Sequence, residues 1–123
     1  MKIKDILVEL EAEQVWATNC PGYENCEVNA CHASDQISDV LTFHGEGSLL
    51  LTGLTNSQVI RTAEILDFVA ICFVRGKIPQ PDTIKLAEVK GIMMFATPYS
   101  MYTACGRLYA KGIPAGRPKK GDE

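Results

Sequence analysis

The chain has 123 residues, 46% of them hydrophobic and 22% charged, which is typical of one globular domain. Its formal net charge of −3 gives it no basic field for holding a phosphate backbone, so we expect no nucleic-acid partner. No apolar run reaches the roughly 18–20 residues that span a bilayer. The N-terminus also lacks a signal-peptide core, so we expect a cytoplasmic protein with reduced cysteines and no membrane partner.

The first 43 residues are predicted to form two helices and two strands. Apolar residues recur at helical spacing near the N-terminus, and two short stretches further on have the composition of strands. Ser34 or Asp35 can cap the helix that follows the second strand. In chain order, the expected elements are a helix over 3–10, strands over 13–17 and 27–33, and a helix over 34–43.

Three apolar runs dominate the rest of the chain, namely SLLLTG (48–53), VAICFV (69–74) and IMMFAT (92–97). None of them alternates with polar residues, which is typical of strands buried on both faces of a parallel sheet. A helix is predicted after each run. The fold class is therefore predicted to be α/β: a single three-layer domain with a mostly parallel sheet of four or five strands and helices on both faces.

Local signals mark the starts and ends of these three helices. Thr55 and Gln58 have capping-box spacing at the first. Pro81 occupies a first-turn position in the second, and Gly91 is a natural stop after it. Ser100 precedes the third helix, which should end near residue 112.

The predicted domain covers residues 1–112. Residues 113–123 are rich in Pro, Gly and charge, and we expect them to form a flexible C-terminal tail. The hydrophobic core is predicted from the apolar strand positions and the one tryptophan. Its members are Val15, Trp16, Leu49, Leu50, Leu51, Val69, Ala70, Ile71, Phe73, Met93, Met94 and Phe95.

The carboxyl ends of the buried runs form the predicted functional edge, because open parallel sheets bind ligands there. Gly53 leads into a helix start, whose free N–H groups favour an anion. Arg75 adds a cation with a bidentate fork. An ordinary cap or a solvated turn would account for the same residues. The candidate ligand-binding residues are Ser34, Asp35, Thr52, Gly53, Thr55, Asn56, Arg75, Gly76, Thr97 and Ser100.

Catalytic signatures are absent from the sequence. No GxxxxGK[ST] loop is present to hold a nucleotide phosphate, and no pair of carboxylates is held together by spacing alone. Cys31 and His32 are neighbours on a predicted strand, where their side chains should point to opposite faces. We therefore expect no catalytic residue and no cofactor, and the chain is predicted not to be an enzyme.

A metal site is the alternative interpretation of the cysteines. Cys20, Cys26 and Cys31 have C-x5-C-x4-C spacing, and His32 could supply a fourth ligand to a metal ion or an iron–sulfur centre. Such sites usually place two thiolates within roughly two to four residues of each other, so the spacing is loose. The simpler interpretation of these cysteines is small apolar side chains in a loop and a strand.

The segment EVNACHASDQISDV (27–40) resembles the segment that names the DRTGG domains, including its S-D-x-x-S-D-V helix start. The chain departs from that pattern at the twin glycines, where Ala30 or Cys31 stands. The segments VAICFVRGKIPQPDTIKLAEVKGI and TPYSMYTACGRLY are similar both to DRTGG domains and to the N-terminal domain of HPr kinase/phosphorylase. The resemblance covers roughly residues 2–112.

The resemblance implies an α/β unit that accompanies catalytic or nucleotide-sensing domains and has no assigned catalytic residue. Some such relatives stand beside adenine-nucleotide-binding CBS domains, and stand-alone short forms are associated with hydrogenase-type redox systems. The kinase domain with its P-loop has no counterpart here, so the resemblance implies no kinase activity.

The predicted function is a non-catalytic regulatory or interaction module. It would sense a small anionic ligand, either a nucleotide or a phosphorylated metabolite, or dock on a protein partner at the functional edge. We also expect a homo-oligomer, a dimer. The alternative is a redox accessory protein that holds a metal or an iron–sulfur centre through Cys20, Cys26 and Cys31.

Overall fold

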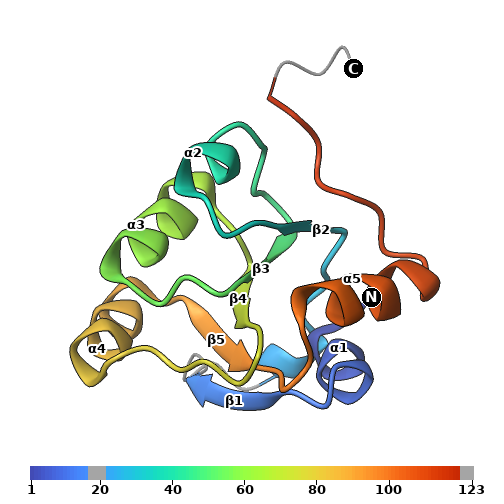
Figure 1. The fold of residues 1–123 in the computed structure, drawn as a ribbon, viewed down its shortest axis with the longest axis horizontal. Helices are drawn as coiled ribbons and strands as arrows, with labels where there is room; N and C mark the ends of the chain where they lie inside the picture. The colour runs from blue at the N-terminus through green and yellow to red at the C-terminus, as the bar shows by residue number, and fades with distance from the viewer. Residues whose placement is uncertain (17–21, 120–123) are drawn as a thin grey trace.

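A five-stranded sheet in the order β1-β5-β4-β3-β2 organises the computed structural model, which describes residues 1–16 and 22–119. Strands β2 to β5 are mutually parallel, and β1 pairs antiparallel with β5 (Figure 1). The strands are β1 (Glu13–Trp16), β2 (Ala30–Ala33), β3 (Ser48–Thr52), β4 (Ala70–Phe73) and β5 (Met93–Ala96). The helices are α1 (Ile3–Glu9), α2 (Ile37–Val40), α3 (Ser57–Leu66), α4 (Pro81–Lys90) and α5 (Met101–Ala110), with a 3₁₀ turn at Tyr23–Asn25.

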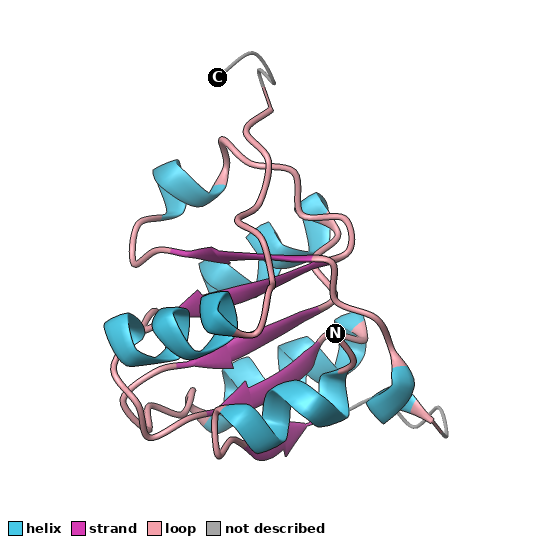
Figure 2. Ribbon diagram, turned by 90° about the vertical axis from the view of Figure 1, so that its right-hand side faces the viewer, coloured by secondary structure: helices cyan, strands magenta, loops and turns pink. Residues whose placement is uncertain are grey.

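Helices cover both faces of the sheet, with α1 and α5 on one side and α2, α3 and α4 on the other (Figures 1 and 2). Successive residues of the central strand β3 divide between these layers. Leu49 and Leu51 pack with α1 and α5, whereas Leu50 packs with α2, α3 and α4. Because both faces of β3 are covered, its three central residues are all leucines. The predicted three-layer α/β fold is confirmed.

The predicted core residues in β3, β4 and β5 are all buried. Val15, Trp16 and Val69 are only half-buried. The first two lie on β1, which pairs with one neighbour only, and Val69 precedes β4. These three residues therefore contribute less apolar burial than the sequence predicts.

The start of α2 differs from the prediction. This helix is a single turn that begins at Ile37, so neither Ser34 nor Asp35 caps it. The Ser34 hydroxyl instead accepts a hydrogen bond from the backbone N–H of Gln36 (3.0 Å). A short polar side chain can accept a hydrogen bond from the backbone in a turn as well as at a helix cap, and Ser34 does so in a turn.

The start of α3 also differs, since the predicted capping box of Thr55 and Gln58 does not form. Asn56 is the N-cap, and its side chain accepts a hydrogen bond from the backbone N–H of Val59 (3.1 Å). The predicted helix signals at Pro81, Gly91 and Ser100 are confirmed.

Residues 113–119 correct the predicted domain boundary. The backbone N–H of Cys31 donates to Pro114 (3.0 Å), and that of Gly116 donates to Cys31 (2.9 Å), so this segment extends the sheet beyond β2. The side chain of Ile113 is buried in the core. Figure 1 shows the segment running from the end of α5 past β2. The prediction of a flexible tail from residue 113 is therefore wrong for residues 113–119, and residues 120–123 lie outside the described part.

Within residues 1–16 and 22–119, none of the helices combines the length and the apolarity that a bilayer crossing requires.

Candidate functional site

The four parallel strands end together at one edge of the sheet, which we call the exit edge. It comprises the segments 34–36, 53–56, 74–80 and 97–100. Backbone hydrogen bonds continue past the strand ends, from Val74 N–H to Thr52 (3.0 Å) and from Thr97 N–H to Phe73 (2.9 Å). The segments therefore leave the sheet side by side, and residues far apart in sequence meet there.

Asp35, Gly53 and Arg75 form the polar centre of the exit edge. The backbone N–H of Gly53 donates to Asp35 Oδ1 at 2.6 Å, and Arg75 Nη2 lies 3.9 Å from Asp35 Oδ2. The carboxylate and guanidinium side chains keep 46% and 44% of their surface exposed, while Gly53 is buried beneath them. We call this group the Asp35–Gly53–Arg75 cluster.

The backbone of Arg75 is held in the left-handed region at φ 59°, which is unusual for a residue with a side chain. Two hydrogen bonds fix it there, from Arg75 N–H to Tyr99 and from Gly76 N–H to Thr97, both 2.8 Å. A Cβ on Gly53 would lie 2.5 Å from Arg75 Nη2, so only glycine lets the guanidinium approach this closely. Strained backbone of this kind often occurs at functional sites.

The hydroxyl groups of Thr52 and Thr97 serve the fold. Both residues are fully buried. Thr52 Oγ1 accepts from Leu54 N–H (3.0 Å), and Thr97 Oγ1 donates to the Leu10 carbonyl (2.6 Å). We therefore no longer expect these two hydroxyls to contact a ligand.

The two helix starts among the candidate residues lie on opposite faces of the sheet. Asn56 caps α3, and Ser100 caps α5 by accepting from Thr103 N–H (3.2 Å). Because α3 and α5 belong to different layers, Ser100 does not converge with Asn56. Of the ten candidates, only Asp35, Thr52, Gly53 and Arg75 contact one another through side chains or the Gly53 N–H.

The described residues among the predicted metal ligands lie in different places and do not converge. Cys31 faces the α1 and α5 layer, whereas His32 points the other way, with Nε2 3.0 Å from Asp39 Oδ2 and its ring against Phe43. Cys26 is exposed. No cluster of three or more His, Cys, Asp or Glu side chains among residues 1–16 and 22–119 could hold a metal ion. Cys20, the remaining predicted ligand, lies outside the described residues.

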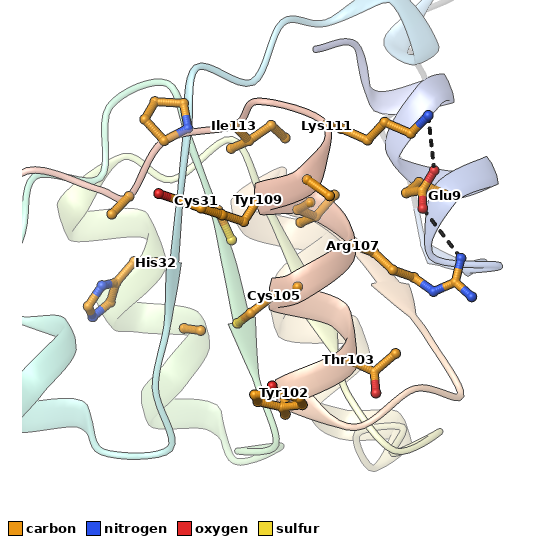
Figure 3. A pocket seen from close by; sticks show the side chains of 16 residues that line it. Glu9, Cys31, His32, Tyr102, Thr103, Cys105, Arg107, Tyr109, Lys111 and Ile113 are labelled. Carbon is orange, nitrogen blue, oxygen red and sulfur yellow. Dashed lines mark hydrogen bonds and ion pairs between the residues drawn. The ribbon is translucent and has the colours of Figure 1, made fainter.

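An open groove of about 800 Å³ runs along α5, and sequence reasoning missed it (Figure 3). Cys31 and Cys105 are among the residues that line it, and burial raises the pKa of both thiols. They therefore stay protonated and are poor nucleophiles. The exposed Tyr102 and Tyr109 lie along the helix, seven residues apart, and that spacing is the signal that could have revealed this surface.

No protein-family model matches the chain, and no curated protein sequence matches it. A solved structure similar in fold is the regulatory region of Clostridium perfringens pyrophosphatase, with its CBS and DRTGG domains, complexed with its activator diadenosine tetraphosphate. The TM-score is 0.64 at 20% sequence identity, over 92% of this chain and 47% of that one. The chain thus spans about half the length of that relative, and it has a DRTGG-like fold.

Proposed function

We propose that this protein is a non-catalytic regulatory module that binds a small anionic ligand, a nucleotide or a phosphorylated metabolite, at the exit edge. The observation that carries this proposal is the Asp35–Gly53–Arg75 cluster, in which a backbone N–H and a guanidinium converge on one carboxylate. The oxygen atoms of a phosphate group use the same two kinds of donor. The regulatory region of the pyrophosphatase, which is similar to this chain in fold and has a nucleotide activator, gives further support to this ligand class.

The start of α3 adds to the attraction for an anion. Its first backbone N–H groups have no partner within the helix, and the helix dipole favours negative charge there. Asn56 is exposed and follows Gly53 by three residues. The contact set that we propose is therefore Gly53, Asn56, Arg75 and Gly76. The expected homo-oligomer, the cytoplasmic location and the similarity to HPr kinase stay predictions.

Isothermal titration calorimetry tests the proposal with ATP, AMP, inorganic pyrophosphate and diadenosine tetraphosphate as probes. We expect saturable binding of at least one probe, weakened by Arg75→Ala. Arg61→Ala is the matched control, because it removes an exposed cation from the middle of α3 without changing the exit edge. Equal binding by both variants, or no saturable binding of any probe, would contradict the proposal.

A further inference from the structure

We infer that Asp35 is a built-in competitor at the ligand site: its carboxylate occupies the position of the ligand's anionic group and must leave when the ligand binds. This inference rests on the proposed function and adds a regulatory step to it. The exit edge is then closed by the protein's own carboxylate until an anion of higher charge replaces it.

The Asp35 carboxylate already occupies both donors of the cluster, the Gly53 N–H and the Arg75 guanidinium. The Gly53 N–H has one hydrogen and already donates it to Asp35 Oδ1 at 2.6 Å, within the range of strong charge-assisted hydrogen bonds. The guanidinium of Arg75 lies against the second carboxylate oxygen, at 3.9 Å. An incoming phosphate therefore cannot use this N–H while the carboxylate remains.

Gly53 is buried, although the two charged side chains above it are partly exposed. The same side chains would meet a Cβ added to Gly53, at 2.5 Å from Arg75 and 3.2 Å from Asp35. These two side chains therefore cover Gly53, and its N–H, which is bonded to Asp35, becomes accessible to a ligand only after the carboxylate moves. Because Arg75 is the attractive partner for an anion, Asp35 is the group that must move.

The surroundings of Asp35 allow this movement. Ser34 is anchored by its N–H to the Leu51 carbonyl (3.1 Å), and Asp35 lies between that anchor and the single turn of α2. Its carboxylate is 46% exposed, so the ion pair with Arg75 contributes little to stability. The Thr52 hydroxyl donates to Asp35 Oδ1 only at the long distance of 3.5 Å. The strong bond is that from the Gly53 N–H, and a phosphate oxygen of the ligand would take the place of the carboxylate on it. The side chain can therefore turn into water while the backbone of β2 stays in place.

Displacement would also transmit a signal. The cluster with Asp35 in place contains one cation and one anion, so its net attraction for a ligand is small. A bound phosphate would repel the displaced carboxylate, and the segment 34–36 and α2 are the elements attached to it. Ligand binding at β3 and β4 would then be reported by a shift of α2.

Titration of inorganic pyrophosphate without divalent metal tests the inference. Asp35→Asn keeps the size of the side chain and removes its charge, and Asp35→Ala empties the position. Asp67→Asn is the matched control, because it makes the same change in charge beyond the end of α3, where φ is 67° and asparagine is well tolerated. We expect about five- to tenfold tighter binding by both Asp35 variants, from the removal of one nearby like charge, and less than a twofold change for Asp67→Asn.

Each outcome of this titration either supports or overturns the inference about Asp35. Binding by the Asp35 variants alone, with none by the parent, would support the inference in its strongest form. Parent binding that depends on Arg75, combined with equal or weaker binding by Asp35→Asn and Asp35→Ala, would overturn it and leave the proposed function intact. The absence of pyrophosphate binding in all variants would overturn the inference, and the nucleotide probes would then decide the proposed function separately.

Discussion

The two ends of the sheet are closed in different ways. At the end where the strands begin, Phe68 and Ile92 are 6% and 5% exposed, and Gly45 packs against the backbone carbonyl of Leu66. The exit edge is closed instead by Asp35 and Arg75, which stay partly exposed. The apolar and backbone contacts at the first end offer no charged group that a ligand could bind. In the charged pair at the exit edge, a ligand anion can replace Asp35 as the partner of Arg75.

Gly45 and Gly53 show the same difference between the two ends of the sheet, in the atoms that an added Cβ would meet. A Cβ at Gly45 would clash with the Leu66 carbonyl oxygen, which belongs to the backbone of α3. A Cβ at Gly53 would lie 2.5 Å from the tip of the Arg75 side chain, which can move. The first glycine is therefore required by the fold, and the second by the candidate site.

Gly45→Ala should have the largest effect on stability. The added methyl group must displace the backbone of α3 or the ring of Phe68, at 2.8 Å. We expect the free energy of unfolding to fall by about 2–4 kcal/mol, the scale of overpacking with backbone strain. Urea denaturation followed by circular dichroism measures this, and a loss below about 1 kcal/mol would show that this end of the sheet is adaptable after all.

Arg75→Ala should weaken anion binding by about 1.5–3 kcal/mol, the usual scale for hydrogen bonds to a charged group. Alanine keeps the Cβ and so leaves the left-handed backbone strain unchanged. Because the guanidinium is partly exposed, the free energy of unfolding should change by no more than about 0.5 kcal/mol. Calorimetric titration and urea denaturation give the two values. Normal binding by a much less stable variant would show that Arg75 is a structural residue.

Asn56→Ala should lower the free energy of unfolding by about 1 kcal/mol, because the Val59 N–H loses its capping partner. Thr55→Ala is the control, with an expected change within about 0.5 kcal/mol. Urea denaturation measures both values, and a larger loss for Thr55→Ala than for Asn56→Ala would show that Thr55 is the N-cap.

Gly53→Ala should lower the free energy of unfolding only by about 0.5 kcal/mol, because the tip of the Arg75 side chain can move away. The same substitution should weaken pyrophosphate binding, since it separates the guanidinium from the Gly53 N–H. Thermal unfolding and calorimetric titration of one preparation measure both effects. A loss of stability as large as that of Gly45→Ala would remove the difference between the two ends of the sheet.

The sequence predicted the architecture well because each buried strand carries an unbroken apolar run. The exit edge could also be predicted, since parallel strands must end together. The N-cap of α3 was harder to predict, because Thr55 and Asn56 are both favourable N-cap residues. Which of them caps the helix depends on the backbone path into it, which the sequence does not specify. The C-terminal segment was missed because its contacts with Cys31 join residues more than eighty positions apart.

The interaction of Asp35 with Gly53 was beyond sequence reasoning for a similar reason. It depends on the register of β2 against β3, in which Ala33 pairs with Leu51. A shift of one residue would have turned the neighbouring side chains to the other face. Asp35 was recognised as a candidate, but its role as a partner of the Gly53 N–H required the structure.

The most direct test of the central claim is a titration of ¹⁵N-labelled protein with ATP, followed by the chemical shifts of the backbone amides. We expect the largest shifts at Gly53, Asn56, Arg75 and Gly76, with smaller shifts at residues 34–36. The largest shifts at Gly47, Phe68 and Gly91, at the opposite end of the sheet, would contradict it.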